Sequence, residues 1–197
     1  MFVSSVRTVA PTEAAVSLAD VKEFMYVDVD DCDGDGLLTA HINAAEKWLE
    51  DESGLALLTQ TRRASWEMLD ADTRTFILPR PPLQTVTTVE YLDSTATWQT
   101  LSSSLYDLQA DRKPGRVTIR SGSLPSIHST IPLTYRITYV CGYADTAALL
   151  MVAEPALVLL LKALIKDIDG GCAPGESKSG KMLLDIYRIQ PISFAAA

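Results

Sequence analysis

The sequence predicts an α+β fold, a helical bundle with an antiparallel β insertion between the second helix and a long C-terminal helix. Three observations support this prediction: an apolar stretch at 147–168, an amphipathic stretch at 37–53, and a segment at 57–143 rich in Thr, Val and aromatic residues. We expect a single domain at 17–169, with helices at 17–54 and 147–169 and the β insertion at 57–143. An extended lead at 1–16 precedes this domain, and a flexible linker, short helix and tail follow it at 170–197.

Composition places the chain among ordinary globular proteins, with 197 residues, 47 % apolar and 21 % charged. The net charge of −8 argues against a protein that grips nucleic acid through a basic groove. Cys32, Cys141 and Cys172 form no C-x-x-C motif, which fits free thiols in a reducing compartment. The first residues contain no secretory signal, so we expect assembly in the cytoplasm.

Two helices are predicted before the β insertion. Ser17 is a candidate N-cap with Asp20 three residues later, and it predicts a short helix through about Met25. A second helix at 37–53 ends before Gly54, a typical C′ glycine. Its apolar face consists of Leu38, Ile42, Ala45 and Leu49, with Trp48 beside them.

The β insertion contains one clear strand and several weaker ones. Residues 133–139 alternate apolar and polar side chains, as a strand with one buried face does. Pro79, Pro81 and Pro82 must lie at a corner or edge, because proline cannot donate to a ladder. The weaker candidates are 60–69, 75–78, 86–92, 98–101 and 116–120.

The long C-terminal helix is the element around which we expect the fold to be organised. Pro155 suits its first turn. Apolar residues then cover one face (Leu157, Leu160, Leu161, Leu164, Ile168) and much of the other (Val158, Leu159, Ile165). Such a helix either forms the axis of one core or packs against a neighbouring copy. A membrane span is the alternative, but Glu154, Pro155 and Lys162 interrupt it.

No motif predicts a cofactor, a metal or an enzyme. Asp31, Asp33, Asp35 and Gly36 match the first positions of an EF-hand loop, but Ile42 stands where a Glu is needed, and a solvated turn explains the same residues without a metal. Residues 175–181 match G-x-x-x-x-G-K but follow a Gly/Pro linker instead of a strand. His41 and His128 have no partners at catalytic spacing.

Several strings, taken in order, resemble the head-tail connector (adaptor) proteins of tailed bacteriophages and gene transfer agents. The resemblance covers about residues 16–188, and its most specific strings are LPRPPL at 78–83 and ITYVCGY at 137–143. Weaker matches are SLADVK at 17–22, Val27-Asp28, Leu37-Leu38, Ile42, Ala44-Ala45-Glu46, Ser53-Gly54, TQT at 59–61, Val86, Val89-Glu90-Tyr91, Pro114-Gly115-Arg116 and Pro155. The acidic loop at 28–36 and the long linker before the last helix depart from the family pattern.

The resemblance implies a structural virion protein at the head–tail interface. Such proteins form a homo-oligomeric ring, commonly a dodecamer, beneath the portal protein. The ring extends the DNA channel and provides a docking platform for head-completion or tail-terminator proteins. DNA would pass through without specific binding, because an acidic lining repels phosphates.

The apolar helices supply the candidate contacts with a second subunit or the portal. We expect these at Leu38, Ile42, Trp48, Leu157, Leu161, Leu164, Leu183 and Tyr187. Two alternatives stay open: a ligand- or carbohydrate-binding accessory module of a phage tail that uses the β insertion, and an enzyme with an unrecognised site.

Overall fold

The structure is a computed structural model that describes residues 2–28, 33–67, 74–120, 127, 131, 133–152, 162–163 and 165–166. The chain divides into two compact units. The described residues of the first, the β unit, lie within Met1–Ala10 and Thr59–Gly142. Those of the second, the helical unit, lie within Pro11–Leu58 and Tyr143–Pro191.

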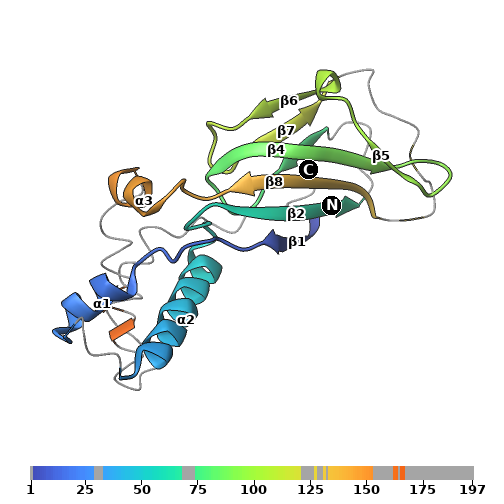
Figure 1. Ribbon diagram of the computed structural model, residues 1–197. Helices are drawn as coiled ribbons and strands as arrows, with labels where there is room; N and C mark the ends of the chain where they lie inside the picture. Colours follow the sequence, from blue (N-terminus) through green and yellow to red (C-terminus); the bar gives the residue numbers. More distant parts are fainter. Residues whose placement is uncertain are drawn as a thin grey trace. The chain divides into compact units, whose positions relative to one another are not determined.

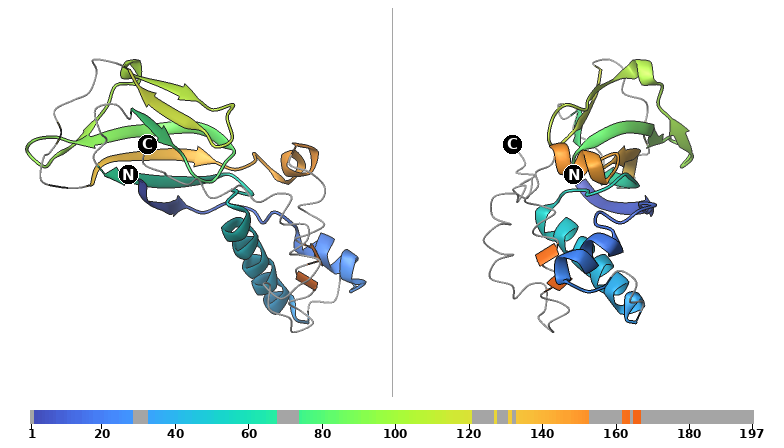
Figure 2. Two further views of the ribbon diagram at one scale, coloured as in Figure 1. Left: turned by 180° about the vertical axis from the view of Figure 1, so that it is seen from behind. Right: turned by 60° about the vertical axis from the view of Figure 1, so that its left-hand side comes forward.

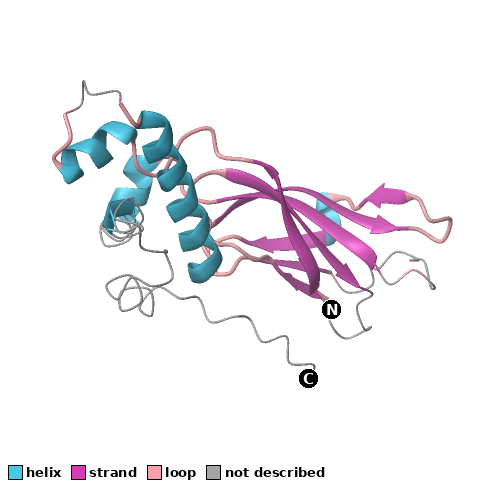
Figure 3. Cartoon of the chain, turned by 90° about the horizontal axis from the view of Figure 1, so that it is seen from below, coloured by secondary structure: helices cyan, strands magenta, loops and turns pink. Residues whose placement is uncertain are grey.

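The predicted fold class is wrong, because the described residues form mainly antiparallel sheet. Eight strands make two sheets, and the α-helices among these residues are α1 (Leu18–Met25), α2 (Asp35–Ser53) and α3 (Thr146–Val152). Figure 3 draws the strands in magenta and the helices in cyan. The prediction gave most weight to the apolar stretch at 147–168. Among the described residues, most of the largest fully buried side chains belong to strands: Tyr135, Tyr139, Phe76, Ile119 and Ile137. The β unit therefore has its own core and is not an insertion into a helical bundle.

The larger sheet has five antiparallel strands in the order β1-β2-β8-β4-β5 (Figure 1). Their bounds are β1 (Phe2–Val9), β2 (Gln60–Glu67), β8 (Leu133–Cys141), β4 (Leu83–Leu92) and β5 (Trp98–Thr100). The smaller sheet has the order β3-β7-β6, with β3 (Thr75–Ile77), β7 (Arg116–Ile119) and β6 (Tyr106–Gln109). A 3-10 turn at Ser103–Leu105 precedes β6. The six predicted strands are confirmed to within a few residues, and β1 and β6 were not predicted.

Aromatic side chains join the two sheets of the β unit. Phe76 of the smaller sheet is fully buried, and its ring lies 5.1 Å from that of Trp66 and 5.2 Å from that of Tyr135 in the larger sheet. Tyr139 lies on the same face of β8 as Tyr135, and its hydroxyl donates to the Pro79 carbonyl at 2.8 Å. Burial raises the pKa of the Tyr139 hydroxyl, so it stays a neutral donor. The core of the β unit is thus formed where the sheets meet.

Local signals indicated the start of the first predicted helix and the end of the second. The Asp20 amide donates to the Ser17 hydroxyl at 3.1 Å, which confirms Ser17 as the N-cap of α1. Gly54 has φ 71° and ends α2, as predicted, because glycine adopts the left-handed conformation without steric cost. Helix α2 begins at Asp35, two residues before the predicted start.

The C-terminal predictions are only partly within the described residues. Helix α3 begins at Thr146, and the Asp145 carboxylate accepts from the Ala148 amide at 2.7 Å. Of the helix predicted from Pro155, residues 162–163 and 165–166 are described and helical. Pro155 itself and the predicted linker and last helix lie outside the described residues. No helix of the described part is long and apolar enough to cross a membrane.

Candidate subunit interface

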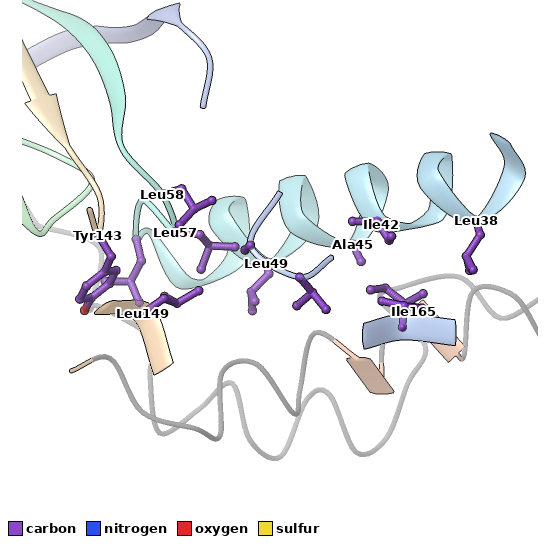
Figure 4. Packing of buried hydrophobic residues seen from close by; sticks show 13 residues of the cluster. Leu38, Ile42, Ala45, Leu49, Leu57, Leu58, Tyr143, Leu149 and Ile165 are labelled. Carbon is purple, nitrogen blue, oxygen red and sulfur yellow. The ribbon is translucent and has the colours of Figure 1, made fainter. Parts of the chain in front are cut away.

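The α2 residues predicted to contact a second subunit lie on the face of the helix that forms the core of the helical unit. Leu38 and Ile42 are 8 % and 3 % exposed, and Ala45 and Leu49 continue the same face (Figure 4). Trp48 is half-buried and packs against this core. The contact of Leu38, Ile42 and Trp48 with a second subunit stays a prediction. Of these three, Trp48 has the most exposed surface.

Two described residues of the predicted C-terminal helix, Lys162 and Ile165, contact other parts of the helical unit. Ile165 is fully buried in the apolar core of the helical unit. The Lys162 ammonium lies 6.0 Å from the centre of the Phe24 ring, within range of a cation–π contact. The other predicted contact residues, Leu157, Leu161, Leu164, Leu183 and Tyr187, lie outside the described residues.

An exposed apolar surface lies where α1 ends and α2 begins. Tyr26 is 95 % exposed, Val27 is 37 % exposed and Leu37 is 62 % exposed; we call these three residues the helical tip. Tyr26 has φ 60°, and amide–carbonyl hydrogen bonds from Tyr26 and Val27 to the last turn of α1 hold this reversal. An ion pair between buried Lys22 and Asp35, 2.5 Å from Nζ to Oδ1, ties α1 to α2.

The second exposed apolar surface is the edge strand β1, the outermost strand beside β2 (Figure 2). Val3, Val6 and Val9 are 47–56 % exposed, and we call them the valine edge. Val6 lies opposite Arg63 and Val9 opposite Thr61, with a bulge between Arg7 and Val9. Because Thr61 and Arg63 are two residues apart on β2, Val6 and Val9 share one face of the sheet.

The opposite face of the same strands is buried and polar at the edge. The Arg62 guanidinium donates to the Ser5 hydroxyl at 3.1 Å and to the Gln60 side-chain oxygen at 3.2 Å. The Ser5 hydroxyl also lies 3.4 Å from the Tyr139 hydroxyl. These bonds fix β1 to the sheet, so the valine edge is held on an ordered strand.

The charges of the chain are divided unequally between the units. Over their sequence ranges, the β unit has ten Lys and Arg and seven Asp and Glu, a net +3. The helical unit has seven Lys and Arg and eighteen Asp and Glu, a net −11, which together with +3 gives the −8 of the chain. The two exposed apolar surfaces therefore lie on units of opposite charge.

The described residues contain no group of three His, Cys, Asp or Glu side chains placed to hold a metal ion. Asp35, one of the calcium-like positions, pairs with Lys22. Asp31, another of these positions, and His128 lie outside the described residues, and the Cys141 thiol is buried.

No protein-family model and no curated protein matches the sequence. Among solved structures, the chain is similar to one in the neck of an empty gene transfer agent particle, computed with C6 symmetry. The TM-score is 0.75 and the identity 20 %, covering 96 % of this chain and 97 % of that chain. This chain shares the fold of a chain in that neck.

Two further structures give the same result. The neck of a native particle, computed with C12 symmetry, has a TM-score of 0.73 at 18 % identity. The virion of a native gene transfer agent particle has a TM-score of 0.70 at 20 % identity. In both, the match covers 96 % of this chain and 97 % of the other. At this identity the likeness establishes the fold, and it extends over both units.

The sequence prediction did not find the helical tip or the valine edge. The N-terminal residues were expected to be an extended lead, although the three valines and Thr8 are residues that favour strands. Tyr26 was not identified because it lies just after Met25, where the predicted helix ends, and so outside the apolar face of that helix.

Proposed function

We propose that this chain is a structural, non-catalytic protein of the neck of a phage-like particle, where copies form a ring beneath the portal. The observation that carries the proposal is the fold likeness to a neck chain over 96 % of this chain, at a TM-score of 0.75. The necks of those particles were computed with six-fold and twelve-fold symmetry, which favours a homo-oligomeric ring, such as a dodecamer, for this chain too. The strings that resemble connector proteins support the same role independently.

In this role the ring extends the DNA channel and provides the surface on which head-completion or tail-terminator proteins dock. The net −11 of the helical unit supports passage of DNA without specific binding to that unit, because its acidic residues repel phosphates. We keep Leu157, Leu161, Leu164, Leu183 and Tyr187 as proposed contacts with a second subunit or the portal. Leu38, Ile42 and Trp48 remain proposed contacts as well, with Trp48 as the first to test by substitution.

Deletion of the gene in cells that produce the particles tests this function. We expect heads that have packaged DNA but carry no tails, and plasmid-encoded chain should restore tailed particles and be found at their necks by cryo-electron microscopy. A matched control plasmid encodes the same chain with a stop codon after Ala10. Tailed particles with complete necks in the deletion strain would overturn the proposal.

A further inference from the structure

We propose that the valine edge of one copy, together with Arg63, contacts the helical tip of the next copy in the ring. This inference rests on the proposed ring and adds which two surfaces meet. The occupant of each surface is a second copy of this chain. Each copy carries both surfaces, so the contact runs head to tail, the geometry that closes a ring when the rotation allows it.

The valine edge is a surface that proteins usually protect. A sheet edge presents unpaired backbone donors and acceptors, and natural edges are kept short, carry Pro or Lys, or are covered. Strand β1 has eight residues and no Pro, its one charged residue is Arg7, and its three valines are about half exposed. The side chain of its neighbour Arg63 is exposed, and within the described part of the chain this side chain makes no hydrogen bond or ion pair. The surface is therefore apolar with a positive charge beside it.

The helical tip has the matching properties. Tyrosine is favoured at the centre of interfaces because it brings a large apolar ring and one polar group at little entropic cost. Tyr26 is almost fully exposed on the turn that ends α1, Val27 follows it, and Leu37 is exposed in the first turn of α2, which the Lys22–Asp35 ion pair ties to α1. Exposed acidic side chains accompany the tip at Glu23, Asp28 and Asp33. The tip is therefore apolar with negative charges around it.

Charge decides between this pairing and the two symmetric alternatives. Two valine edges in contact would bring Arg63 against Arg63, and two helical tips would bring acids against acids. Juxtaposed like charges cost several kcal/mol at interfaces, whereas the mixed pairing places Arg63 among carboxylates. The net +3 of the β unit and −11 of the helical unit also favour contact between unlike units of neighbouring copies over contact between like units.

Cross-linking within assembled particles tests the contact. Cys32→Ser and Cys172→Ser remove two native thiols and leave the buried Cys141, and Val6→Cys with Leu37→Cys then places one thiol on each surface. Purified particles are treated with a short bismaleimide and probed with an antibody against the chain. We expect a ladder at multiples of 21.4 kDa, and dimers at most from each single variant. A matched control replaces Val6→Cys by Leu108→Cys, which is 41 % exposed on β6, and should give no ladder.

A charge exchange tests the same contact without thiols. Arg63→Glu should lower the amount of the chain in particles by about tenfold or more, and adding Glu23→Arg should restore it. Arg112→Glu, the same charge change at another exposed site of the β unit, should have no effect.

The outcomes separate this inference from the proposed function. If the chain without substitutions is absent from particles, the proposed function is wrong, and so is the proposed contact between copies. If the chain without substitutions is at the neck but neither the ladder nor the charge rescue is seen, the contact alone is wrong. Dimers without higher multiples would likewise exclude the head-to-tail arrangement.

Discussion

A methyl group at residue 115 would collide with Leu83. A Cβ built on Gly115 would lie 2.5 Å from Cδ2 and 2.7 Å from Cβ of Leu83, closer than the 3.0 Å below which real Cβ contacts essentially never occur. Leu83 is 7 % exposed, and the Gly115 carbonyl accepts from the Leu78 amide at 2.9 Å, so neither side can move freely. Overpacking of this kind costs about 1–3 kcal/mol. We therefore expect Gly115→Ala to destabilise the β unit by that amount.

Urea unfolding measures this loss. In a Trp48→Phe background the remaining tryptophans, Trp66 and Trp98, both belong to the β unit and report its unfolding by fluorescence. With a urea dependence of about 2 kcal/mol per molar, the midpoint should fall by about 0.5–1.5 M.

A second glycine provides the control for that experiment. A Cβ added to Gly36, in the first turn of α2, would meet nothing within 4 Å, so Gly36→Ala should leave the stability of the β unit unchanged. Adding Leu83→Ala to Gly115→Ala should cost less than the sum of the single losses, because the collision disappears. An unchanged or higher midpoint for Gly115→Ala would refute the steric reasoning.

Three further predictions concern single contacts. Ser17→Ala removes the N-cap of α1 and should cost about 1 kcal/mol in the unfolding of the helical unit, measured by circular dichroism in urea. Hydrogen bonds from the Thr95 hydroxyl first and the Thr97 amide next lower the pKa of Asp93 from 3.8 to about 2. The hydrogen bonds to the Asp93 carboxylate therefore stabilise the turn at Asp93–Thr97 fully above pH 4, and this stabilisation is lost as the pH falls through 2. An NMR titration of the carboxyl checks it, and Asp93→Asn should abolish the pH dependence. The Arg136 guanidinium donates two hydrogen bonds of 2.7 and 2.8 Å to the Glu90 carboxylate. A double-mutant cycle with Glu90→Gln and Arg136→Met should therefore give a coupling free energy of about 1 kcal/mol. A coupling of zero would show that this ion pair does not stabilise the β unit.

Elements set by neighbouring residues were predictable. A capping hydroxyl acts on an amide three residues away, and a C′ glycine acts on the turn before it, so Ser17 and Gly54 could be assigned from the sequence. The alternation in β8 was equally local, since each second side chain faces the core.

Elements set by distant residues were not predictable. Strand β1 pairs with β2, and Val6 meets Arg63 across 57 positions of sequence, so nothing near residue 6 indicates the pairing. The fold class failed for a related reason. Counting apolar residues gave weight to 147–168, while among the described residues short, half-polar strands contribute most of the largest buried side chains.

The net charge of −8 describes neither unit, so repulsion of DNA phosphates differs between the two units. An acidic wall repels phosphates only where acids dominate, which is true of the helical unit and not of the β unit. Part of the basic excess of the β unit is engaged by other groups of the same unit. Among its arginines, Arg136 is held by Glu90, exposed Arg120 by Asp107, and Arg62 by buried neutral groups. Arg63 is left exposed beside an apolar strand, which suits a protein surface that offers both carboxylates and an aromatic ring.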